Sequence, residues 1–158
     1  NLEAEIDQIE SDLESARAEQ ILYLYSWGLT HQINASDSYN TAISALRNDN
    51  YRGARAEFNV AFGYYHSAEN NFRGAGNRAD EFGERTVEDY CSDSEARCLN
   101  MKEAVGHYQI AMRYLIDGRD SAAQSRLDSG DTSYDIGQGY ELRNLSALES
   151  ELGVTIDV

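Results

Sequence analysis

The sequence contains no proline among its 158 residues, although a chain of this length carries roughly eight on average. Proline ends helices and shapes loops, so its absence favours long helices joined by short turns. Runs of alternating β-branched residues are also missing, and only the tail at 153–158 has a strand-like composition. The composition therefore predicts an all-α chain that forms one domain, 1–158.

Lysine is almost absent as well, since Lys102 is the only one and all other basic residues are arginines. The formal net charge is −15, so phosphates would be repelled, which disfavours nucleic acid and anionic membranes as partners. A solvated acidic surface is the plain interpretation. Scarce lysine beside retained arginine also resembles proteins of salt-loving archaea, whose carboxylates hold water and cations at high salt. This resemblance implies a halophilic source.

Long hydrophobic runs are missing too. The longest apolar cluster, Ile21 to Tyr25, is far shorter than the roughly 20 residues that span a bilayer. The chain begins at Asn1 and not at Met, so we expect a processed or excised part of a longer protein. Missing flanking segments could tether it to a membrane.

Only two cysteines are present, Cys91 and Cys98, and they bracket a polar stretch that we interpret as a turn. We expect a disulfide there, with two free buried thiols as the alternative. The triplets that begin at Asn34 and Asn144 are candidate N-glycosylation sites. Together these features favour an extracellular or cell-surface location.

Residues 51–75 hold the clearest positive pattern. Tyr51, Phe58, Tyr65 and Phe72 alternate with Ala54, Ala61, Ala68 and Ala75 at spacings of four and three. Both sets therefore fall on one stripe of a helix, where alanine allows a neighbouring helix to approach while the rings fill the gaps. The stripe at Met101, Ala104, Tyr108, Ala111, Leu115, Gly118 and Ala122 repeats this alternation.

The pattern predicts helices at about 2–33, 37–48, 50–88, 94–129 and 139–152. Leu2, Ile6, Ile9, Leu13 and Ala16 form the first stripe, and the stripe after residue 39 is out of phase with it. Either one long helix drifts or it breaks near residue 34. We expect an elongated antiparallel up-and-down bundle of three long helices and a shorter fourth, with Ala/aromatic heptad seams.

Three histidines, His31, His66 and His107, occupy one long helix each at similar expected heights. Three imidazoles with an open fourth position would make a zinc site. His66 and His107 flank their seams, however, so unliganded histidines are the favoured interpretation and a metal-binding bundle remains an alternative.

No catalytic motif is recognisable, and we expect no enzymatic activity and no cofactor. Tyrosine is abundant, and Trp27 with Tyr23 are candidate exposed anchors for a protein partner. The sequence favours a non-enzymatic extracytoplasmic helical module of a halophile, with a structural or protein-interaction role through a partner or self-association. A ligand-sensing ectodomain of a membrane receptor is the other alternative.

Overall fold

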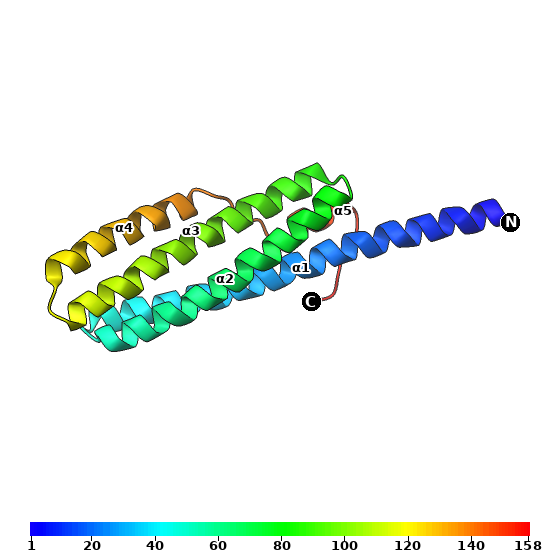
Figure 1. Cartoon of the computed structure of the whole chain (residues 1–158). Coiled ribbons are helices and arrows are strands. Elements are labelled where there is room, and N and C mark those ends of the chain that lie inside the picture. Colours follow the sequence, from blue (N-terminus) through cyan, green and yellow to red (C-terminus); the bar gives the residue numbers. More distant parts are fainter.

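The computed structural model describes residues 1–158 and is entirely helical. Five helices follow one another: α1 (Leu2–Arg47), α2 (Tyr51–Glu81), α3 (Arg85–Ile116), α4 (Asp120–Gln138) and α5 (Leu145–Leu152). Figure 1 shows that α1, α2 and α3 run up and down beside one another, and that the first part of α1 projects beyond the others. The predicted antiparallel bundle with three long helices is confirmed.

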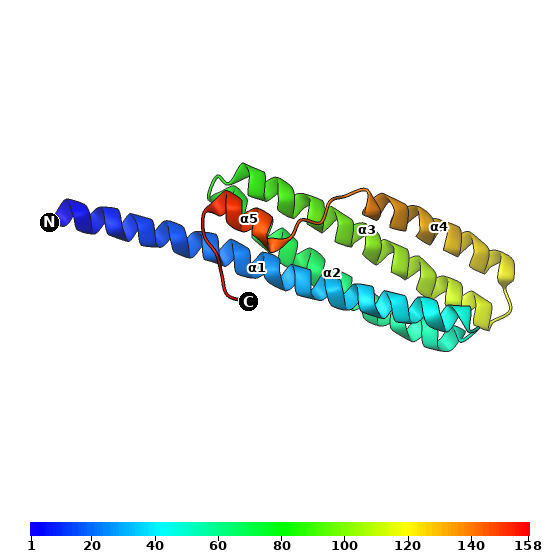
Figure 2. The ribbon, with the colours of Figure 1, turned by 180° about the vertical axis from the view of Figure 1, so that it is seen from behind.

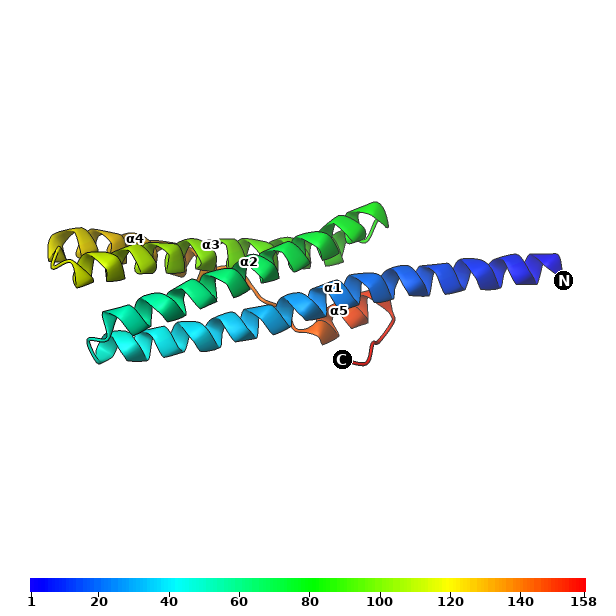
Figure 3. The same cartoon turned by 60° about the horizontal axis from the view of Figure 1, so that its bottom comes forward.

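Helix α2 is the centre of the bundle, because it packs against α1 on one side and α3 on the other. Its predicted seam is buried, with Ala54, Phe58, Ala61, Tyr65, Ala68, Phe72 and Ala75 inaccessible to solvent. Figure 3 shows α2 passing from the side of α1 to the side of α3 and α4. The small residues allow this approach: a Cβ built on Gly28 of α1 would meet the Phe72 ring at 2.6 Å.

Helices α4 and α5 complete the bundle on either side of α3. α4 packs along α3, where the ring of Tyr108 lies against Gly130 and its hydroxyl donates to Asp131 at 2.6 Å. α5 lies between α1 and α3, as seen from behind in Figure 2. The segment before α5 is held by the Tyr25 hydroxyl, which donates to the Arg143 carbonyl oxygen at 2.7 Å.

The three interhelical turns share one form, in which a single residue adopts the left-handed conformation. These residues are Asp49, Gly83 and Gly118, with φ of 56°, 74° and 70°. The turn at 48–50 agrees with the sequence prediction, but the other two do not. α2 ends at Glu81 and α3 begins at Arg85, so the expected turn between the cysteines is wrong. Gly118 lies in the turn that separates α3 from α4, and the predicted single helix 94–129 is two helices.

Helix α1 is continuous through residues 34–36, so the predicted separate helices 2–33 and 37–48 are wrong, and the alternative of one long helix is correct. Ala35 and Ala42 are fully buried there, and together with Gly28 they place small residues at intervals of seven against α2. Polar residues nearby bond within the helix, as Thr41 does by donating to the Asp37 carbonyl oxygen at 3.0 Å. Packing on the small-residue face therefore outweighs the local preference of Asn and Ser for turns.

Candidate functional site

The first part of α1 extends beyond the bundle as a free helical arm. We define the arm as residues 2–17, which precede Ala18, the first buried residue of the chain. All arm residues are exposed except Ser15, which is half-buried. At 1.5 Å per residue the arm is about 24 Å long. Figure 1 and Figure 2 both show it clear of the other helices over most of this length.

Local interactions explain why the arm is helical. The Asn1 side chain accepts a hydrogen bond from the Glu3 backbone N–H at 3.0 Å, which caps the first turn. Glu3 and Glu5 lie in that turn, where negative charge is favoured. The Gln8 side chain donates to Asp12 at 2.8 Å, one helical turn further on. The packed remainder of α1 supplies the nucleus from which the arm extends.

An apolar stripe, interrupted only at Gln20, follows the arm onto the bundle. We call it the outward seam, and it comprises Leu2, Ile6, Ile9, Leu13, Ala16, Gln20, Tyr23 and Trp27, all of them exposed. Their spacing alternates strictly between four and three, which is the pattern of a coiled-coil seam. The exposed fraction is 73% for Leu2, 66% for Ile9 and 54% for Trp27. The seam spans about 37 Å of helix.

The outward seam lies on the opposite side of α1 from the bundle core. At 100° per residue, the buried Ile21, Leu22 and Tyr25 point away from the seam. Continued into the arm, the core-facing side carries Asp7, Ser11 and Glu14, which are polar. The exposed apolar residues therefore do not belong to the face of α1 that packs in the bundle. They form a second apolar face on the same helix.

The two aromatic anchors predicted from the sequence lie at one end of this seam. Tyr23 and Trp27 are both exposed, and they border a shallow hollow of about 550 Å³ with Gln20, Leu24 and Arg78. The hollow is wide enough for an apolar side chain. The aromatics are recognisable as candidate anchors from the sequence, but only the structure shows that the stripe at 2–16 lies outside the bundle and continues to them.

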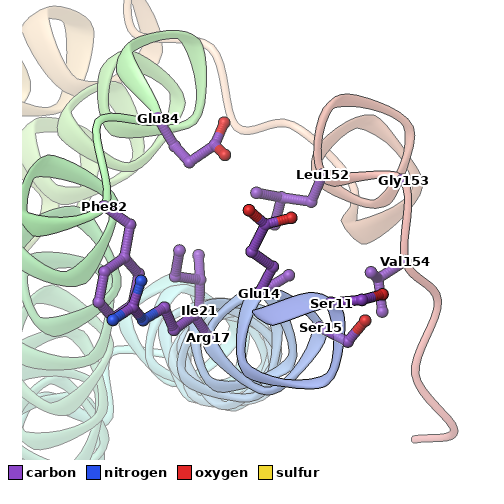
Figure 4. Close-up of a pocket in the computed structure, with 11 residues that line it drawn as sticks. Ser11, Glu14, Ser15, Arg17, Ile21, Phe82, Glu84, Leu152, Gly153 and Val154 are labelled. Carbon is purple, nitrogen blue, oxygen red and sulfur yellow. The ribbon is translucent and has the colours of Figure 1, made fainter. Parts of the chain in front are cut away.

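A second cleft lies where the arm leaves the bundle. It measures about 400 Å³ and is bordered by α1 at residues 11–21, by the turn between α2 and α3, and by residues 152–154. In Figure 4 the carboxylates of Glu14 and Glu84 point into it, and the guanidinium of Arg17 lies over the Phe82 ring, 5.0 Å from its centre. No group of three metal-ligating side chains gathers here or elsewhere.

The three histidines are not brought together, so the alternative of a zinc site built from them is wrong. His31 stacks on Tyr64, with ring centroids 6.2 Å apart. The Nδ1 atom of His66 lies 3.4 Å from the Lys102 ammonium, and that of His107 lies 3.2 Å from the Arg126 guanidinium. Each ring therefore has its own neighbour, and the positive charges of Lys102 and Arg126 beside His66 and His107 disfavour a metal ion at those two rings.

The two cysteines form no disulfide, which corrects the sequence prediction. Both lie on the continuous helix α3, about 10.5 Å apart along its axis, whereas a disulfide needs Cα atoms within about 7 Å. Burial raises the pKa of each thiol to about 12, so both are neutral and unreactive. They extend the α3 seam towards its N-terminus as small buried residues, with Val87 and Ser94.

The candidate glycosylation sites differ in their surroundings. Asn34 is half-buried within α1, where the backbone is helical. Asn144 is exposed and caps α5, because its side-chain oxygen accepts from the Ala147 backbone N–H at 3.1 Å. The structure tests neither for modification, and both remain predictions.

A buried ion cluster that the sequence did not reveal joins α2 to α3. The Glu69 carboxylate is 4% exposed, and its two oxygens lie 2.5 Å from the Lys102 ammonium and 2.6 Å from the Arg73 guanidinium. Arg73 also contacts Glu95 at 2.7 Å, and this contact raises its pKa. The only lysine of the chain is thus a bundle residue, with a side chain 17% exposed.

Comparison of the chain with models of known protein families, with curated proteins and with solved structures gives no match. No helix of the structure combines the length and the hydropathy that a membrane crossing requires.

Proposed function

We propose that this chain is a non-enzymatic protein-interaction module that presents the outward seam of α1 to another polypeptide. The observation that carries the proposal is an exposed heptad stripe, from Leu2 to Trp27, that the fold itself does not use. Exposed contiguous apolar surface is costly in water and marks interaction sites on soluble proteins. The strict spacing of four and three further favours a helical partner, because only a helix presents side chains at that interval.

Several side chains that could otherwise do chemistry are buried or paired within the bundle. Both thiols are buried, and the Tyr25 hydroxyl lies 2.8 Å from Ser94 while it donates to a carbonyl oxygen. The Glu69 carboxylate is neutralised by two cations. These observations support a role in binding over one in catalysis.

The size of the native assembly tests the proposal. The chain would be purified under mild conditions from its native host, as wild type and as Ile9→Asp with Leu13→Asp. We expect a complex larger than the monomer for the wild type only. Ile33→Asp is the matched control, because Ile33 is 57% exposed on the same helix but lies off the seam. A wild-type monomer, or equal loss in the control, would contradict the proposal.

We also propose that the protein works at high salt. Its net charge of −15 and its single, largely buried lysine support this, because lysine stems add apolar surface that concentrated salt makes adhesive. Circular dichroism tests it by following helix content from molar to millimolar KCl. Loss of helix on desalting is expected, and an unchanged spectrum would remove the proposal.

Because the cysteines form no disulfide, only the candidate N-glycosylation sites at Asn34 and Asn144 still support an extracytoplasmic location. A receptor ectodomain is the second candidate function, and one observation favours it. The C-terminus lies beside α1 towards the end of the bundle from which the arm projects, as Figure 1 and Figure 2 agree. Both termini can thus lead in one direction. Glycan mass on the chain from its native host would support export, and an unmodified mass would count against it.

A further inference from the structure

The outward seam is flanked by negative charge along the arm. In a coiled coil the positions beside the apolar seam face the flanks of the partner and set partner choice. Ile6 and Ile9 are seam residues, which fixes the flanking positions. Within the arm these positions hold Glu3, Glu5, Glu10, Asp12 and Arg17, and the next one, just beyond the arm, holds Glu19. All but Arg17 are acidic, and the arm residues among them are exposed.

This charge pattern argues against a second copy of the chain as the occupant. In a parallel pair Glu5 of one copy would face Glu10 of the other, and in an antiparallel pair like flanks would also meet. Carboxylates in contact with carboxylates across a coiled-coil interface are destabilising. The acidic residues beside the outward seam therefore favour a partner that carries positively charged residues beside its own seam.

From the charge complementarity and the heptad spacing, we propose that the outward seam docks a basic amphipathic helix of another protein. The occupant would have apolar residues at its own seam positions and Lys or Arg beside them along the arm. An apolar side chain of the occupant would fill the hollow at Tyr23 and Trp27. This inference rests on the proposed function, and it adds the chemistry of the partner.

Trp27 provides a direct readout, because it is the only tryptophan of the chain and lies in the seam. The probes are three synthetic four-heptad peptides with the same Leu and Ile seam and with Lys/Arg, Gln or Glu at the flanks. Each would be titrated into the full chain, with Trp27 emission and calorimetry as measurements. The titration is done at the lowest KCl concentration that preserves native helix content, and again at 3 M.

The basic peptide should shift Trp27 emission to shorter wavelength and bind about tenfold more tightly than the Gln peptide at the lower salt. This difference should shrink at 3 M KCl, where charges are screened beyond about 2–3 Å. Ile9→Asp with Leu13→Asp should abolish binding, and Ile33→Asp should leave it unchanged. Glu5→Gln with Glu10→Gln and Asp12→Asn should remove the preference for the basic peptide.

The possible failures are distinct. Equal or tighter binding of the Gln peptide would overturn the basic partner while leaving the seam as an interaction surface. A seam-dependent dimer of the chain alone, seen by sedimentation, would likewise replace the basic helix with a second copy. Absence of binding by all three peptides, with no such dimer, would remove both this inference and the proposed function.

Discussion

The Lys102 ammonium of α3 lies 2.5 Å from the buried carboxylate of Glu69 on α2, and this contact joins the two helices at mid-length. Glu69→Ala would leave Lys102 without its carboxylate and Arg73 with Glu95 alone. We expect a loss of about 2–4 kcal/mol in the free energy of unfolding, since one partner of a buried ion pair is removed.

Glu81→Ala is the matched control for this prediction. Glu81 pairs with Arg78 at 3.1 Å on the surface of the same helix, and exposed pairs contribute at most about 1 kcal/mol. Urea unfolding of both variants at one salt concentration decides the matter. A similar loss for the two would show that burial of Glu69 adds nothing to the strength of its contacts.

Gly28 allows α1 and α2 to approach each other at Phe72. In Gly28→Ala the new methyl group would lie 2.6–2.9 Å from three atoms of the Phe72 ring, which is itself fully buried. The helices or the ring must shift, and we expect a destabilisation of about 1–3 kcal/mol. Thermal unfolding is the measurement.

Gly63→Ala gives the opposite expectation on α2. No atom lies within 4 Å of a Cβ at Gly63, so alanine gains its helix propensity without a clash. We expect a stabilisation of up to about 1 kcal/mol. If both glycine variants changed stability in the same direction, the close approach at Gly28 would not be the cause of the loss.

The free thiols predict how the protein responds to reagents. Cys91 and Cys98 are fully buried in α3, and burial raises the pKa of both, so a thiol reagent should react only as the bundle opens. The intact mass should not change on reduction. A two-dalton gain would contradict the helical path of α3 through both residues, and rapid labelling of the native protein at pH 8 would contradict their burial.

Buried phenols and thiols predict a loss of stability in alkali. Burial raises the pKa of Tyr39, Tyr65, Cys91 and Cys98 to about 12, and it raises the pKa of Tyr25 and Tyr108 as well. In the unfolded chain these groups titrate at about 8.5 for Cys and 10 for Tyr.

The folded state therefore holds more protons than the unfolded state above about pH 8, where the thiols of the unfolded chain begin to ionise. Stability should be full below that pH and should fall as the pH rises towards 12. Urea midpoints between pH 7 and 11 measure the trend, and absorbance of tyrosinate measures the ionisation. The buried tyrosines should ionise together with loss of helix. Ionisation of every tyrosine near pH 10 in a fully helical protein would be the contrary result.

Particular residues show what the sequence could predict. The rings and alanines of α2 were identifiable because their spacing matches a helical stripe and nothing interrupts it. The turn at Gly118 was missed because Leu115, Gly118 and Ala122 keep that spacing through the turn, although the left-handed backbone at Gly118 ends α3. Hydrophobic periodicity indicates which residues share a helix face. A glycine on that face can be either a packing residue or the residue at which the helix ends.

The outward seam was only partly identifiable for a similar reason. Apolar spacing at Leu2 to Ala16 indicates an amphipathic helix, but it does not say what covers the apolar face. Two apolar faces exist on α1 near residue 21, and only the arrangement of α2 and α5 shows which one is buried. The ion cluster at Glu69 was hidden because its members come from two helices.

A crosslinking scan of the arm tests the central claim most directly. A photoreactive amino acid would replace each residue from 2 to 17 in turn, and the yield of adduct with another polypeptide would be measured in the native host. We predict that the yield peaks at positions 2, 6, 9, 13 and 16, with the spacing of the outward seam. Yields that ignore position, or that peak at the polar face of Asp7, Ser11 and Glu14, would contradict the seam as a contact surface.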